Sequence, residues 1–526
     1  MGTEIAGLAT PPSPPARAAR HPAKASLTRR AGLNVAASLL DYGAKIAVNF
    51  IVIPILVAGL GRSLYGVWEM LGRLVGYLTA GDGRPTQALR LVVSNLQGSE
   101  DDEAKRRYIG AALVVWLLFI PVILAAGVVV VWLAPILTKV DPAVQSSVRL
   151  TAALLVVGLL CANLASLPES VLRGMNLGYK RMGLQAGLEV LGGVLTAGAI
   201  GLGLGIAGAA GSQIVFGALL GVCFWYVVRK YVPWFGVARP TKADVRSLLG
   251  LSAWYSGGEA IAKLLLASDA VILGILVSPG AVAAYVLTGH AARLAVNVHL
   301  LAAGGATPGI GGVIGKQQME KAARLRYELL AVTWAFAASV GGTILLWNRS
   351  FLSLWVGSVN YAGPLVNLFI VLIMTQTALI RSDSFIIDAT LQPRRRVIVA
   401  AATAVITIVL ATLLTWRFGM IGLCIGMFAG RLTQSIAYPV LAHSCLKSAN
   451  APRIATFIRP LIVLTLLFAG CAYLGQYLVV DHWAVWVLGV AATFALTLGA
   501  AVLSGLPAEY RRTVLGRVRE LARLSR

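Results

Sequence analysis

Residues 39–95 read LLDYGAKIAVNFIVIPILVAGLGRSLYGVWEMLGRLVGYLTAGDGRPTQALRLVVSN, and this stretch decides the fold. It contains two long apolar segments, each about as long as the roughly 20 residues that cross a membrane. The apolar pattern is interrupted by ionisable side chains, which are Asp41, Lys45, Glu69, Arg73, Asp82, Arg84 and Arg90. Because a charge facing lipid is costly, these side chains should face a protein interior or a wet cavity. The stretch is therefore typical of a membrane protein with a polar interior.

Much of this pattern returns about 220 residues later, in residues 251–296, which read LSAWYSGGEAIAKLLLASDAVILGILVSPGAVAAYVLTGHAARLAV. The matched pairs are Asp41 with Glu259, Lys45 with Lys263, Gly61 with Gly280, Tyr65 with Tyr285 and Arg73 with Arg293. One small insertion brings all of these pairs into register. We interpret the match as an internal duplication whose copies begin on the same side of the membrane, which is a parallel repeat.

The composition excludes a soluble multi-domain protein. Of the 526 residues 58% are apolar and only 13% are charged, and the mean hydropathy is +0.80. The net charge of +24 would suggest nucleic acid in a soluble chain. Here, thirty-two Lys and Arg residues alternate onto one side of the predicted spans and four onto the other. This distribution is an orientation signal that predicts cytoplasmic N- and C-termini, and it argues against nucleic acid as a partner.

Fourteen segments are long and apolar enough to be spans. Their approximate limits are 33–60, 64–97, 108–134, 145–172, 182–204, 206–228, 246–277, 281–305, 326–348, 362–390, 397–416, 418–446, 458–480 and 483–505. The predicted fold is thus an all-α polytopic membrane protein with about 14 transmembrane helices, in two pseudo-symmetric six-helix lobes plus two C-terminal helices.

The loops divide these spans into domains. We predict a disordered cytoplasmic tail (1–32), an N-terminal lobe (33–228), a cytoplasmic linker (229–245), a C-terminal lobe (246–446), two further spans (447–505) and a basic amphipathic tail (506–526). No predicted outer loop exceeds about 15 residues. Because membrane polymerases and ligases of glycans work on long outer loops, we expect no enzyme and no catalytic residue.

Four arginines within the spans have no acid three or four residues away, namely Arg90, Arg293, Arg381 and Arg431. They need a partner from another helix or from a ligand, and guanidinium suits a diphosphate because its planar fork binds two oxygens. The pairs Asp41/Lys45, Glu259/Lys263 and Glu69/Arg73 are spaced i,i+4 and could instead neutralise themselves. Four acids are left as ion-coupling or helix-end groups, which are Glu189, Asp269, Glu328 and Asp388.

Other motifs favour structure over chemistry. The five cysteines lie in apolar segments without metal or disulfide spacing, and His290 and His299 are expected to be interior histidines, so we predict no metal site. Gly81–Pro85 should break the second span, because Pro85 lacks a backbone donor. Gly422, Gly426 and Gly430 should form a close-packing ridge.

One part of the stretch resembles the signature region of bacterial polysaccharide-export flippases, in which LG-x-x-x-YG-x-W is followed by YL…DLG…A-x-R. The residues on this pattern are Tyr65, Gly66, Trp68, Tyr77, Leu78, Asp82, Gly83, Ala88 and Arg90. The chain therefore resembles a Wzx-like O-antigen flippase of the multidrug/oligosaccharidyl-lipid/polysaccharide (MOP) exporter superfamily, polysaccharide transporter branch. It departs from the pattern at Gly81-Asp82-Gly83, where Asp-Leu-Gly is usual, and in its long N-terminal tail.

The resemblance implies a cavity between two lobes that opens alternately to either side of the bacterial inner membrane. Its cargo would be an undecaprenyl-diphosphate-linked oligosaccharide for exopolysaccharide or lipopolysaccharide biosynthesis, and polymerase or export machinery would be further partners beside the membrane lipids. We expect cavity residues at Lys45, Arg73, Lys263 and Arg293, with Arg90, Arg381 and Arg431 nearer the cytoplasm. No cofactor is expected. Proton or Na+ coupling would fall to Asp41, Glu259 or Asp269.

Two other transporters use the same fold, and both remain open at this point. A MATE-like drug or cation exporter should place unpaired acids, rather than arginine, at the centre of the cavity. A lipid II flippase would differ in its substrate alone.

Overall fold

The computed structural model describes residues 23–507 apart from 98, 182, 391, 392 and 447–454, together with 510–512 and 516. Within these residues the chain is helical and has no strand. The first six α-helices are α1 (Ala23–Leu78), α2 (Pro85–Asn95), α3 (Asp102–Thr138), α4 (Gln145–Gly174), α5 (Leu184–Gly201) and α6 (Gly205–Tyr231). The next six are α7 (Lys242–Leu276), α8 (Pro279–Thr288), α9 (His290–Gly315), α10 (Met319–Trp355), α11 (Pro364–Ala389) and α12 (Pro393–Leu446). The last two are α13 (Ala455–Leu474) and α14 (Trp483–Ala500).

Five short helical turns complete the description. They are η1 (Thr79–Gly81), η2 (Pro142–Val144), η3 (Gly178–Arg181), η4 (Ser358–Asn360) and the π-turn η5 (Ala501–Gly505).

Two of the long helices are broken by a glycine into two halves. Gly61 in α1 has φ +73°, and Gly419 in α12 has φ +59°, a backbone region that side chains with a Cβ avoid. We call the halves α1a (23–60) and α1b (62–78), and α12a (393–418) and α12b (420–446).

Nine helices in the described chain are long and apolar enough to cross a membrane, and the pair α8–α9, bent by 49°, makes a tenth. That number counts α1 and α12 once each, and it leaves out α7 and α13, whose described apolar parts are shorter. Each of the fourteen predicted spans therefore corresponds to a helix, a helix half or the α8–α9 pair. The all-α polytopic fold is confirmed.

The halves of α12 form an antiparallel hairpin held by the predicted glycine ridge. A β-carbon at Gly422 would lie 1.9 Å from the carbonyl oxygen of Leu414, one at Gly426 would lie 2.5 Å from Ala411 Cα, and one at Gly430 would lie 2.4 Å from Thr407 Cα. The residue numbers of the contacted positions decrease as those of the glycines increase, so the two halves run in opposite directions. The close-packing ridge is confirmed, and only glycine allows this approach of the two backbones.

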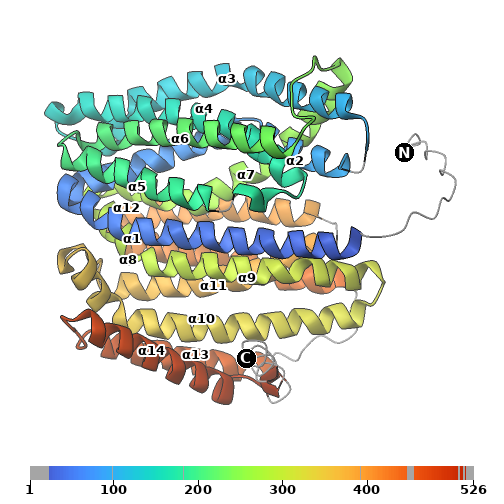
Figure 1. Ribbon diagram of the computed structural model, residues 1–526. Helices are drawn as coiled ribbons and strands as arrows, with labels where there is room; N and C mark the ends of the chain where they lie inside the picture. The colour runs from blue at the N-terminus through green and yellow to red at the C-terminus, as the bar shows by residue number, and fades with distance from the viewer. Residues whose placement is uncertain are drawn as a thin grey trace, which may run out of the picture.

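Figure 1 shows long helices lying side by side, with α3, α4 and α6 along one edge and α10, α13 and α14 along the other. We call α1–α6 the N-half and α7–α12 the C-half. Helix α4 packs against α6 in the N-half as α11 packs against α12 in the C-half. The two C-terminal helices lie on α10, where Trp347 Nε1 donates a 2.9 Å hydrogen bond to Thr493 Oγ1.

The duplicated turns pack directly on each other and join the two halves. A β-carbon at Gly66 would lie 1.8 Å from the carbonyl oxygen of Pro279, so the backbones of α1b and α8 touch there. Beside this contact, Arg62 Nε donates a 3.0 Å hydrogen bond to the carbonyl of Gly280. The two segments that we interpret as copies of a duplication therefore contact each other directly.

Three predicted boundaries change. Helix α1 begins at Ala23, so the predicted disordered tail 1–32 is wrong for its last ten residues, whose backbone continues the first span. Residues 1–22 and most of the predicted amphipathic tail 506–526 lie outside the described residues. The linker is shorter than 229–245, because α6 continues to Tyr231 and α7 begins at Lys242. The break at Gly81–Pro85 is confirmed, since α2 begins at Pro85.

The ridge makes a stability prediction. Gly426→Ala should lower the free energy of unfolding by about 1–3 kcal/mol, because the added methyl meets backbone atoms that cannot move aside. The matched control is Gly470→Ala in α13, where nothing lies within 4 Å of the new methyl. Thermal unfolding of both variants in detergent measures the difference, and equal midpoints would refute the close contact.

Candidate functional site

A cavity of about 800 Å³ lies against both halves of α1. Its walls come from α1a, α1b, α4, α5 and α6, and α8 and α9 of the C-half close one side. Glycines line it at 72, 76, 158, 192, 193 and 217, and this lack of side chains leaves room between the helices. The predicted cleft between two equal walls is therefore asymmetric, because most of its lining belongs to the N-half.

A largely buried ion pair joins the cavity wall to the C-half. Arg73 on α1b donates a 3.0 Å hydrogen bond to Asp269 on α7. The second oxygen of Asp269 accepts a 3.1 Å hydrogen bond from the hydroxyl of Tyr285 on α8. Both charged side chains are largely buried, with 18% and 12% of their side-chain surface exposed. Asp269, which we predicted as an ion-coupling group, is therefore a partner of Arg73, and the possible i,i+4 pairing of Glu69 with Arg73 stays a prediction.

Arg293 lines the cavity without a carboxylate. Its guanidinium donates to the carbonyl of Val286, seven residues earlier on α8, and no ion pair from Arg293 occurs within the described part of the chain. Nearby, Tyr65 donates a 3.2 Å hydrogen bond to Glu69, and both of these side chains also line the cavity. Arg293 is thus a charged donor whose remaining N–H groups face open space.

One acid in the wall also lacks a partner among the described residues. Glu189 on α5 lines the cavity and makes no ion pair there. His290 lies between the cavity and Trp355, whose ring centroid is 4.8 Å from its own. The lining as a whole carries two arginines and two glutamates, so the site is not simply cationic.

Uncharged polar and aromatic side chains complete the lining, and our sequence reasoning singled out none of them except Trp68, which lies on the signature pattern. They are Asn49, Trp68, Thr79, Thr196, Ser212, Gln213 and Phe216. Amides such as Asn49 and Gln213 inside apolar segments are a signal that could have found them, because a bare amide in lipid is costly. Thr196 and Ser212 also bond to each other, with 2.9 Å between their hydroxyl oxygens.

The other predicted cations lie outside this lining. Lys45 is an exposed side chain on α1a, one turn before the wall residues Val48 and Asn49. Lys263 lies beside Gly76, where a β-carbon would be 4.0 Å from its Nζ. Arg90 is exposed on α2.

Arg381 and Arg431 lie together in a different pocket, between α7, α11 and α12. Their predicted place in the inner half of the central cavity is therefore wrong.

The predicted acid–lysine pairs fare differently. Asp41 lies 3.8 Å from Arg181, which also pairs with Glu169 at 3.0 Å, so its expected self-pairing with Lys45 is wrong. The side chain of Glu259 lies outside the described residues.

A family model described as "Polysaccharide biosynthesis protein" matches residues 32–308, which is more than half of the chain. The chain belongs to this family. No curated protein matches it.

Solved structures with the same fold are MOP-superfamily transporters. The lipid II flippase MurJ in an inward closed conformation aligns with a TM-score of 0.64 and 12% identity, covering 88% of this chain and 98% of that one. An inward-facing multidrug resistance transporter of the MATE family aligns with a TM-score of 0.60 and 14% identity, covering 78% of this chain and 99% of that one. A MOP superfamily transporter from Pyrococcus furiosus aligns with a TM-score of 0.52 and 16% identity, covering 80% of this chain and 97% of that one. At these identities the likeness shows the fold alone, and the family is shown by the match of the family model.

The ion pair across the halves of this family member is directly testable. Arg73→Gln and Asp269→Asn should each lower the free energy of unfolding by about 3 kcal/mol, because each leaves a largely buried charge unpaired. The double variant should lose less than the sum, with a coupling energy of about 1 kcal/mol or more. Denaturant titrations of the four proteins supply the cycle.

The control cycle combines Asp269→Asn with Arg349→Gln, whose guanidinium binds the carbonyl of Gln476 instead. That pair of changes should be additive. Additivity in the Arg73 cycle as well would contradict the ion pair.

Proposed function

We propose that this chain is a flippase that moves a lipid-linked oligosaccharide, with an undecaprenyl-diphosphate anchor, across the bacterial inner membrane. The observation that carries the proposal is Arg293, a cavity arginine with no carboxylate among the described residues. Family membership and the transporter fold support a role in moving a polysaccharide precursor. The substrate itself is inferred from the chemistry of the cavity.

The diphosphate would bind where Arg293 and Arg73 face the same space. Arg293 offers N–H groups that form no ion pair with any acid that the structure describes, and a guanidinium keeps its charge when desolvated. Arg73 is already paired with Asp269, so a diphosphate at Arg73 would compete with that carboxylate. Binding of the substrate would then loosen a contact that joins α1b to α7.

The sugars would fill the rest of the cavity. Its volume of about 800 Å³ lies within the range of about 300–1,000 Å³ typical of ligand pockets. Asn49, Gln213 and Glu189 offer acceptors and donors for hydroxyl groups, and Trp68 and Phe216 offer flat apolar faces for the sugar rings. An amphoteric lining of this kind suits a head group that combines a few charges with many hydroxyls.

Alternating access requires the contacts between the two halves to open. At the Gly61 end these contacts are the touching backbones of Gly66 and Pro279 and the 2.7 Å hydrogen bond from Trp355 Nε1 to the carbonyl of Phe50. In our proposal this end opens to release the head group, while the polyprenyl tail stays in the lipid. Proton or Na+ coupling, cytoplasmic termini and delivery to polymerase or export machinery belong to the same proposal.

One observation favours a second candidate. Glu189 is an acid without a partner in the described residues and faces the cavity, which a cation or drug exporter would use. A lipid II flippase remains the alternative that differs in substrate alone. Substitution of Glu189 separates the first of these from a flippase, and the identity of the lipid that accumulates in a deletion strain separates the second.

The test is complementation of a strain that lacks the gene. We expect the deletion to trap lipid-linked oligosaccharide on the cytoplasmic leaflet, and Arg293→Gln to restore about tenfold less surface glycan than the unaltered protein, because the diphosphate loses a charged donor. Arg417→Gln, which removes the same charge from an exposed site outside the cavity, should restore it fully.

Membrane abundance is measured for each variant. An abundant Arg293→Gln protein that restores full surface glycan would contradict the proposal. Loss of activity in Glu189→Gln but not in Arg293→Gln would favour the cation exporter.

A further inference from the structure

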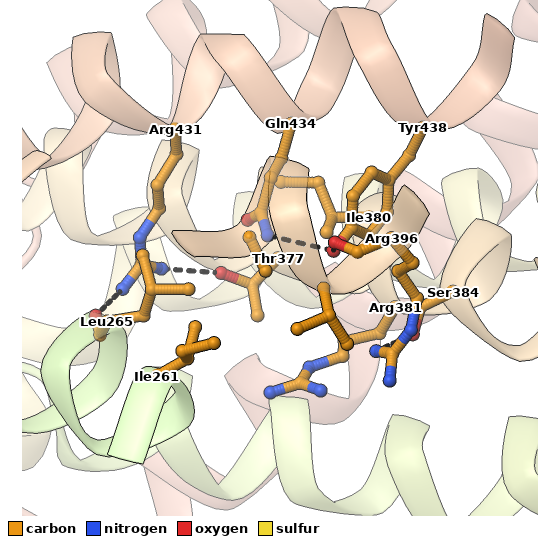
Figure 2. Close-up of a pocket in the computed structure, with 12 residues that line it drawn as sticks. Ile261, Leu265, Thr377, Ile380, Arg381, Ser384, Arg396, Arg431, Gln434 and Tyr438 are labelled. Carbon is orange, nitrogen blue, oxygen red and sulfur yellow. Dashed lines mark hydrogen bonds between the residues drawn. The ribbon is translucent and has the colours of Figure 1, made fainter. Parts of the chain in front are cut away.

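The second pocket lies between α7, α11 and both halves of α12, near the end where α11 ends and α12a begins (Figure 2). Its volume is about 90 Å³. That is several times the roughly 10–15 Å³ that one water needs, so the pocket has room for a group of the size of a phosphate. Figure 2 shows the side chains of Arg381, Arg396, Arg431, Gln434 and Tyr438 around this space.

Arg431 on α12b is a buried cation without a counter-ion. Only 6% of its surface is exposed. It donates 2.9 Å and 2.8 Å hydrogen bonds to Thr377 Oγ1 and to the carbonyl of Leu265, and its Nε has no partner. It forms no ion pair with any carboxylate in the described chain. A charge removed from water in this way is strongly unfavourable unless another charge compensates it.

Arg381 on α11 brings a second guanidinium to the same space, and it makes neither a hydrogen bond nor an ion pair with the described residues. Arg396, the third, pairs with Asp388 at 2.8 Å and donates a 3.1 Å hydrogen bond to Ser384. The lining therefore has three guanidinium groups and no carboxylate, with Asp388 beside Arg396 as the neutralising acid. Arg381 and Arg431 thus have no carboxylate at ion-pair distance among the described residues.

Helix α7 carries residues of both sites. Its residues Ile261 and Leu265 line the arginine pocket. About one turn further along, Ser268 accepts a 3.0 Å hydrogen bond from Tyr77, and Asp269 binds Arg73. The arginine pocket and the central cavity share no lining residue.

We propose that this pocket binds a phosphoryl group, either of a free phosphate or of an anionic lipid head group. Guanidinium forks bind phosphate oxygens in pairs, and a single phosphoryl group supplies the charge that Arg381 and Arg431 lack. The amide of Gln434 and the hydroxyl of Tyr438, 3.1 Å apart, offer further hydrogen bonds at the wall. The proposal does not depend on the substrate of the central cavity.

The test measures binding to the purified full chain in a neutral detergent or in phosphatidylcholine nanodiscs. Inorganic phosphate and pyrophosphate, titrated calorimetrically, probe the free source. Phosphatidic acid in the nanodiscs, detected by native mass spectrometry, probes the lipid source. Arg381→Gln should weaken binding of whichever probe the unaltered protein binds by about tenfold or more. The substitution removes no hydrogen bond or ion pair within the described protein.

Arg395→Gln is the matched control, because it removes the same charge from an exposed position on the same turn as Arg396. It should bind like the unaltered protein, and Arg381→Lys should bind with intermediate strength. If Arg381→Gln loses binding of the soluble anions, the ligand is a free phosphate. If it loses binding of phosphatidic acid, the ligand is a lipid head group. The proposal is overturned if the unaltered protein binds neither probe, if Arg381→Gln binds as tightly as it does, or if binding falls only in Arg293→Gln.

Discussion

The structure depends on the cost of placing charge inside a membrane, and the ion pair between Arg73 and Asp269 is where that cost is met between the two halves of the molecule. A largely buried arginine beside a cavity is stable only if something compensates its charge. Here the compensating acid belongs to the other half, and Tyr285 holds the acid in place. Helix α1b carries both Arg73 and Gly66, and their partners Asp269 and Pro279 lie on the consecutive helices α7 and α8, so charge pairing and backbone contact fix the same interface.

The cavity takes its properties from what the neighbouring helices leave out. Small residues along its walls open a space that larger side chains would fill, and two of its ionisable groups, Arg293 and Glu189, make no ion pair with the described residues. Arg293 and Glu189 therefore face the space with unused hydrogen-bonding capacity. A substrate that brings a diphosphate and hydroxyl groups would satisfy both. In the proposed function, the protein would lower the desolvation barrier that a polar head group meets in the membrane.

Much of the fold was predictable because membrane helices have a strong pattern. Span lengths, the duplicated motif, the break before Pro85 and the glycine ridge of α12 all depend on local spacing, which a sequence displays directly. The partners of the charges were not predictable in this way. Asp41 pairs with Arg181 and not with Lys45 on its own helix. The i,i+4 spacing considers only residues of one helix, so it cannot predict a partner from another part of the chain. Arg431 was placed in the wrong site because the sequence does not show which helices pack together around a given cavity.

The central claim is that water fills the space beside α5. It is tested by thiol labelling of two single-cysteine variants in a chain whose five native cysteines are replaced by alanine. Thr196→Cys lies in the cavity wall, and Val194→Cys lies two residues away on the same helix with 61% of its surface exposed on the apolar outside. A charged, membrane-impermeant thiol reagent should label position 196 and spare position 194. Protection of both positions would contradict the cavity.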